Sequence, residues 1–137
     1  MPRAFRMGVL VLFLVGCADQ GLDPFARWRS YDLHDYTIDQ VRDCFCQLAG
    51  QTMRISVRAD TIASVVNLSD GSEVSNPMAG WYLTVASMFG VMRNTSRDSL
   101  VITFNETYGY PDMLDINPQL HPVDGGVLYR TSNLRIP

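Results

Sequence analysis

The sequence contains no lysine, so all 11 of its basic residues are arginines, and 14 acidic residues leave a formal net charge of −3. The arginines are scattered along the chain and form no concentrated basic stretch. Proteins that bind nucleic acids carry such a stretch or surface, because contacts to phosphates supply much of their affinity. The composition therefore predicts no nucleic-acid partner.

Long apolar runs are also absent, and the one short run lies at the start of the chain. Residues 7–15 are apolar, follow Arg3 and Arg6, and lead directly into Gly16-Cys17. A helix of this length covers roughly half of the ~30 Å hydrocarbon core, which is too short for a membrane span. A basic region, a short apolar region and a small residue before a cysteine are typical of a lipoprotein signal. We therefore expect residues 1–16 to be removed and Cys17 to carry a lipid such as palmitate.

A lipid at Cys17 would attach the protein to a membrane without crossing it. This predicts a lipid-anchored protein of the cell membrane or outer membrane that faces an extracytoplasmic compartment. Residues 17–27 are polar and contain Gly21 and Pro24, so they are expected to tether the lipid to the fold. Residues 28–137 then suit one domain, with Trp28 at its start.

Most of this domain alternates between apolar and polar residues, which is the pattern of half-buried strands. The alternation is clearest at 53–59, and residues 62–68 supply a partner strand after a turn near Asp60. These two segments are predicted to form a hairpin. Further strands are expected within 34–46 and at 100–105, 113–117 and 127–136.

One helix is predicted between these strands. Ser75 and Asn76 are good N-cap residues, Pro77 suits a first helical turn, and Asn94 could end the helix. Large apolar residues follow at helical spacing and predict a face that packs on the core: Trp81, Val85, Met88 and Met92. The order of elements predicts an α+β fold, with an antiparallel sheet of about five to six strands and one central helix packed on one face. The other face is expected to be solvated.

Several short segments occur together in the order found in one family. They are Tyr36-Thr37-Ile38, Cys44-Phe45-Cys46, the hairpin at 54–66, the helix and Tyr108-Gly109-Tyr110-Pro111. With them, the sequence from Trp28 to Leu134 resembles the bacterial lipoproteins grouped as domain of unknown function 6174. It departs from that family at Ala59-Asp60-Thr61, where a glycine is usual. The resemblance implies a lipid-anchored envelope protein and supplies no catalytic residue.

Cys44 and Cys46 are the two cysteines that remain once Cys17 carries a lipid, and outside the cytoplasm such pairs are usually bonded. On a regular strand they would lie ~6.6 Å apart at Cα, near the upper limit for a disulfide. A disulfide therefore predicts a bulge or turn at Phe45. Two free thiols and a metal site are the alternatives. A structural zinc needs four ligands, and the side chains that could add to the cysteines are His34, Asp35, Asp43 and His121.

Sequence motifs of hydrolases, zinc proteases, phosphate loops and dinucleotide-binding loops are absent. Three carboxylates near the second predicted hairpin, Glu106, Asp112 and Asp115, are typical of a polar turn and strand edge. We therefore expect no enzyme, no catalytic residue and no cofactor.

Tyr108, Tyr110 and Pro111 offer two interpretations. They could form an exposed aromatic surface for an unidentified envelope protein or peptide. Equally, both tyrosines could pack while Gly109 supplies a tight turn. The sequence favours a non-catalytic binding or structural module of the cell envelope. The alternative is a thiol- or metal-dependent envelope protein that uses Cys44 and Cys46.

Overall fold

A computed structural model describes residues 21–94 and 99–137, so the expected signal peptide and Cys17 lie outside the described residues. The strands are β1 (Tyr36–Asp43), β2 (Thr52–Arg58), β3 (Thr61–Asn67), β4 (Leu100–Phe104), β5 (Pro111–Ile116) and β6 (Val127–Arg135). The α-helices are α1 (Pro24–Ser30) and α2 (Val85–Asn94), and the 3₁₀ helices are η1 (Met78–Trp81) and η2 (Pro118–Val123). The predicted α+β class is confirmed.

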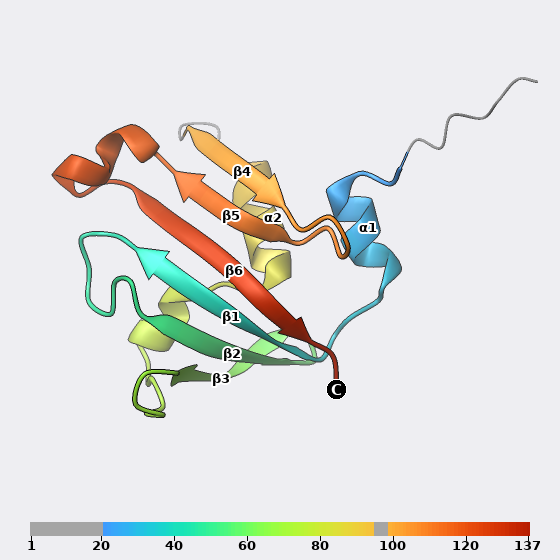
Figure 1. The fold of residues 1–137 in the computed structure, drawn as a ribbon, viewed down its shortest axis with the longest axis horizontal. Coiled ribbons are helices and arrows are strands. Elements are labelled where there is room, and N and C mark those ends of the chain that lie inside the picture. The colour runs from blue at the N-terminus through green and yellow to red at the C-terminus, as the bar shows by residue number, and fades with distance from the viewer. Residues whose placement is uncertain (1–20, 95–98) are drawn as a thin grey trace, which may run out of the picture.

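The six strands form one sheet in the order β3-β2-β1-β6-β5-β4. Every neighbouring pair is antiparallel, and the last strand lies beside the first. Helix α2 and η1 lie behind the sheet in Figure 1, while the near face is open to the viewer. Helix α1 lies at the end of the sheet where β1 begins, and the β1–β2 connection lies at the other end.

The core lies between the sheet and α2. In β2, Met53, Ile55 and Val57 are fully buried, and Arg54 between them faces the open side, as the alternation predicts. Side chains of β1, β3 and α2 complete this layer: Ile38, Val65, Val85 and Phe89. Each such side chain contributes about 1.5–3 kcal/mol when it leaves water, so this layer is a major part of the stability of the fold.

The central helix begins later than the sequence predicts. Residues 78–81 form η1, Tyr82 is extended with ψ 154°, and α2 begins only at Val85. The interruption has its cause in β1, where the buried Gln40 side chain accepts from the Leu83 N–H at 3.0 Å and donates to the Leu83 carbonyl at 3.3 Å. A continuous helix would engage both of these backbone groups. Thr84 then caps α2, because its hydroxyl accepts from the Ser87 N–H at 3.0 Å.

Helix α1 lies partly in the segment that the sequence predicts to be a tether. Asp23 caps it by accepting from the Ala26 N–H at 3.0 Å, and Pro24 occupies the first turn. The ordered fold therefore includes residues 24–27, which corrects the expected boundary. Within the described residues, no helix has the length and apolar character that a membrane crossing requires.

The predicted β2–β3 hairpin is present, although its turn contains no glycine. Ala59 and Asp60 both adopt positive φ, at 47° and 64°. Neighbouring side chains support this conformation, since Asp35 accepts from the Ala59 N–H at 2.8 Å and His34 Nδ1 lies 2.8 Å from Asp60 Oδ2. These contacts compensate for the missing glycine, which adopts positive φ without strain.

Candidate functional site

Cys44 and Cys46 lie at the end of β1 and form a disulfide. The strand stops at Asp43, and the Cys46 N–H donates to the Cys44 carbonyl at 2.9 Å, which closes a γ-turn around Phe45. This turn brings the two Cα atoms to 5.2 Å, well within disulfide range. The chain therefore makes the turn at Phe45 that a disulfide between Cys44 and Cys46 requires.

The disulfide closes a very short loop, so it constrains the unfolded chain little. In the chain-entropy treatment a three-residue loop contributes about 1.6 kcal/mol, against about 4.7 kcal/mol for a 100-residue loop. Both cysteines are half-buried, and the Phe45 side chain between them is 77% exposed. The pair therefore lies within reach of a partner and is a weak brace for the fold.

A pocket of about 200 Å³ lies against the disulfide and is lined by Asp43, Cys44, Phe45, His121 and Gly126. His121 belongs to η2, which joins β5 to β6 at this end of the sheet. Its Nε2 lies 2.8 Å from Asp115 Oδ1, which places a carboxylate directly against the imidazole. A Cβ at position 126 would lie 2.3 Å from the Cδ2 of His121. Gly126 therefore allows the ring to lie directly on the backbone.

The four side chains named as additional metal ligands do not come together. Asp43 and His121 line the disulfide pocket, whereas His34 and Asp35 support the β2–β3 turn. In the described parts of the chain, no group of three or more histidine, cysteine or carboxylate side chains is placed to hold a metal ion.

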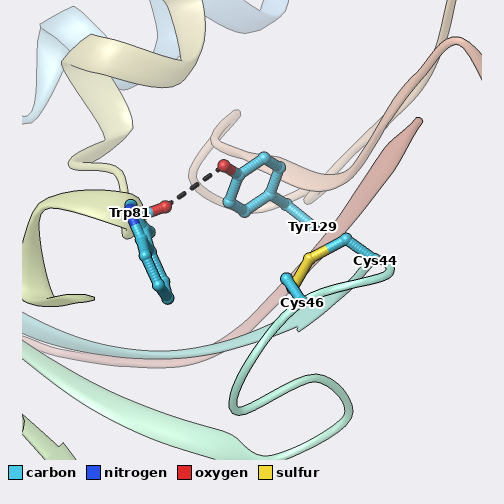
Figure 2. The surroundings of a disulfide bond; sticks show 4 residues. All are labelled: Cys44, Cys46, Trp81 and Tyr129. Atoms are coloured by element: carbon cyan, nitrogen blue, oxygen red, sulfur yellow. Dashed lines mark hydrogen bonds between the residues drawn. A yellow bond between two sulfur atoms is a disulfide. The ribbon is translucent and has the colours of Figure 1, made fainter. Parts of the chain in front are cut away.

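The disulfide lies near a contact that joins the sheet to η1. Figure 2 shows the Tyr129 side chain of β6 close to Cys44, with its hydroxyl donating to the Trp81 carbonyl at 3.1 Å. The Arg42 guanidinium lies 5.0 Å from the centroid of the Trp81 ring. Burial raises the pKa of Tyr129, although the nearby Arg42 partly opposes the shift. The hydroxyl therefore stays protonated and available as a donor.

Tyr108-Gly109-Tyr110-Pro111 lies at the opposite end of the sheet, where it holds α1. Gly109 has φ 81°, and a Cβ there would lie 2.3 Å from the Pro24 carbonyl oxygen. The Tyr110 ring contacts Trp28 edge-on at 6.3 Å between centroids, and Tyr108 contacts Tyr31 at 4.9 Å. The motif is thus an internal clamp on the N-terminal helix.

This packing corrects the expected aromatic surface. Tyr110 is only 4% exposed, Pro111 is fully buried, and Tyr108 is half-buried. The three residues therefore do not form an exposed patch for a partner. The other interpretation describes the structure, because both tyrosines pack around a turn at Gly109.

Asp39 is the most buried charge on the open face of the sheet, with 2% of its surface exposed. It accepts from Arg54 Nε at 2.9 Å and Asn133 Nδ2 at 3.1 Å, and Arg135 lies at 3.5 Å. Burial acts to raise the pKa of this carboxyl, but the hydrogen bonds and the two arginine charges outweigh it and hold the pKa below its ordinary value. Asp39 is therefore an ionised link between β1, β2 and β6, and it has no proton to donate at neutral pH.

These features define a small α+β domain with one covered sheet face, a clamped N-terminal helix and a disulfide at the far end. The chain belongs to the family of unknown function DUF6174, whose sequence model matches residues 22–136. This match confirms the family membership that the sequence indicated, and the matched region includes α1. No curated protein and no solved structure matches the chain.

Proposed function

We propose that this protein is a lipid-anchored component of the cell envelope whose domain is a non-catalytic binding or structural module. The observation that carries the proposal is the signal ending at Cys17 together with a folded domain that begins only a few residues later, at α1. Six residue steps separate Cys17 from Asp23, and a fully extended chain covers about 21 Å over that distance. A lipid on Cys17 would therefore keep the domain close to a membrane.

The partner that we propose is a segment of an envelope protein or peptide, and it binds at the disulfide end. Phe45 and Val123 are the two most exposed of the large apolar side chains described, at 77% and 72%. Phe45 lines the pocket that contains His121, and Val123 lies two residues beyond that histidine. Exposed aromatic side chains beside a pocket are typical anchors of protein interfaces.

The anchor is tested by mass spectrometry of the full chain isolated from membranes. The expected product begins at Cys17, carries a lipid mass, and floats with membranes, whereas Cys17→Ser loses both properties. Cys44→Ser is the matched control and keeps both. A wild-type product that retains residues 1–16 without lipid would contradict the anchor.

The binding surface is tested by comparing partner recovery from solubilised envelope between wild type, Phe45→Ser and Val101→Ser. Val101 is 48% exposed on β4, three strands across the sheet from β1 and its disulfide, and serves as the matched control. We expect Phe45→Ser to lose the partner and Val101→Ser to keep it. Equal recovery with both variants would dismiss this surface.

A second candidate function is thiol–disulfide exchange, and the position of His121 beside the disulfide favours it. A thiolate of an envelope dithiol would attack one cysteine sulfur, form a mixed disulfide and release the other cysteine as a thiolate. His121 can protonate that thiolate. The second thiol of the dithiol then attacks the partner's own sulfur in the mixed disulfide and displaces the bonded cysteine, which leaves as a thiol. The partner thereby loses two electrons and two protons, and the cysteine pair gains them.

The two functions separate in a glutathione titration of the purified protein. Exchange that is fast in wild type and slows in His121→Ala, but not in His34→Ala, would support the second function. A disulfide that exchanges no faster than free cystine would exclude it and leave the binding module.

A further inference from the structure

A cavity of about 300 Å³ lies between α1, α2 and the end of β4, and it is lined by five apolar residues together with Asp23 and Arg93. Pro24 and Phe25 form one wall, Phe89 and Met92 form the second, and Phe104 forms the third. The Phe25 and Phe89 rings meet at 5.0 Å between centroids, so the cavity walls are continuous with the core. It lies beside Asp23, where the chain leads back toward Cys17.

The same end of the molecule exposes apolar side chains next to arginines. Leu22 is 53% exposed and Phe25 is 37% exposed. The guanidinium groups of Arg29 and Arg93 lie 5.5 and 5.1 Å from the centroid of the Phe25 ring. We define this set, Leu22, Phe25, Arg29 and Arg93, as the α1 tip. Apolar side chains flanked by arginines suit the boundary between acyl chains and anionic headgroups.

The direction in which the chain leaves the fold at the α1 tip is fixed by hydrogen bonds. Arg27 donates to the Leu22 carbonyl at 3.2 Å and to the Glu106 carbonyl at 2.5 Å. Asp23 accepts from the Ala26 N–H at 3.0 Å as the cap of α1, and among the described residues no ion pair joins it to Arg29 or Arg93. The Gly109 clamp holds the helix itself against the β4–β5 hairpin. The segment toward Cys17 therefore starts from a rigid point.

We propose that the α1 tip docks on the bilayer surface, with Leu22 and Phe25 in the interface and Arg29 and Arg93 on anionic headgroups. The inference rests on the proposed anchoring at Cys17, because the short segment from Cys17 brings this end of the domain to the membrane. The chain as a whole is acidic, so two arginines gathered here set the tip apart from the average surface. Strand β1 starts at the α1 end and runs eight residues to Asp43, which is about 23 Å. Docking would therefore point the disulfide pocket away from the bilayer.

The test is hydrogen–deuterium exchange of the lipidated full chain, in vesicles that contain phosphatidylglycerol and in detergent. We expect amides of α1 and of the end of α2 to exchange about fivefold more slowly in these vesicles than in detergent, with no change around Cys44. Leu22→Ser and Arg93→Gln should each reduce this protection. Phe45→Ser, at the far end, is the matched control and should retain it.

Flotation of the same samples keeps the anchor and the docking distinguishable. Leu22→Ser should still float, because its lipid is intact, while its protection falls. Equal exchange in vesicles and detergent with normal flotation would overturn the docking but leave the anchor. Slow exchange of the α1 amides that is already present in detergent and is lost in Cys17→Ser would place the protein's own acyl chain in the cavity. This result would also overturn the docking. Failure of wild type to float would contradict the proposed function itself.

Discussion

The two ends of the sheet carry the two most characteristic motifs of the chain, and they use them in opposite ways. At the α1 end, Tyr108-Gly109-Tyr110-Pro111 is turned inward and packs against a helix. At the disulfide end, Cys44-Phe45-Cys46 is turned outward and presents Phe45 to solvent. The first motif is therefore needed to build the molecule, whereas the second is free to take part in a function.

The largest effect is expected at Gly109, because two costs coincide there. Gly109→Ala would place a side chain at φ 81° and a Cβ 2.3 Å from the Pro24 carbonyl oxygen. We expect a loss of about 3 kcal/mol in the free energy of unfolding and release of α1, measured by urea denaturation and amide exchange.

Gly71→Ala is the matched control, since its φ is 74° but a Cβ there would meet nothing within 4 Å. It should cost about 1 kcal/mol, from backbone strain alone. Equal losses for the two variants would show that Gly109 serves only the turn, and the α1 end would no longer differ from an ordinary hairpin.

The next effect concerns Asp39, which links the strands that run between the two ends. Asp39→Asn removes a charge that accepts from Arg54 and Asn133, and hydrogen bonds to charged groups contribute about 2 kcal/mol. Because the pKa of Asp39 is lower in the folded state, its contribution is complete above the ordinary pKa of an aspartate and is lost as the pH falls through the folded pKa. Wild type should therefore lose stability in acid, and the variant should lose less over the same range.

The pH dependence is measured by urea denaturation between pH 7 and pH 3. Asp70→Asn is the matched control, since Asp70 is exposed and its lowered pKa comes from bonds with Ser72 inside one turn. A wild-type profile that Asp39→Asn leaves unchanged would mean that the link between the two ends does not depend on this charge.

The parts of the fold set by local pattern could be predicted from the sequence. The alternation of apolar and polar residues predicted the bounds of β2 and β3 to within one residue. It could do so because side chains such as Met53 and Ile55 are buried on one face of the sheet only. The requirement for a turn at Phe45 also followed locally, because strand geometry alone keeps Cys44 and Cys46 too far apart. Helix α1 was missed, although Asp23 before Pro24 was a usable start signal.

The parts that depend on distant contacts could not be predicted. The start of α2 is decided by Gln40, which binds the backbone of Leu83 from another strand. The burial of Tyr110 depends on Trp28, which lies far away in the sequence. His121 reaches the disulfide only because β6 lies between β1 and β5, an order that no local pattern encodes. The sequence therefore indicated the cysteine pair and four candidate neighbours, but local pattern did not distinguish Asp43 and His121, which lie beside the pair, from His34 and Asp35, which do not.

A smaller effect is expected from the disulfide end. Replacing both Cys44 and Cys46 by serine should cost about 1.6 kcal/mol, because the closed loop contains only three residues. Urea denaturation measures the loss, and amide exchange of α1 should stay unchanged. A loss of 4 kcal/mol or more, or a released α1, would make the disulfide a structural element and remove the contrast between the two ends.

The smallest effect on stability is expected at His34, which supports the β2–β3 turn near α1. Hydrogen bonding to Asp60 is the main cause of its raised pKa, and the charges of Asp60 and Asp32 add to it. A pKa raised by folding gives stability that is complete below the ordinary histidine pKa and is lost as the pH rises through the folded value. The imidazole is largely exposed, so the change in stability should be slight and a nuclear magnetic resonance titration is the sharper measurement. We expect the His34 resonances to titrate above pH 6.5 in wild type and closer to it in Asp60→Asn, with Asp70→Asn as the unchanged control. If the His34 pKa were the same in Asp60→Asn as in wild type, the contact between His34 and Asp60 would not support the glycine-free β2–β3 turn.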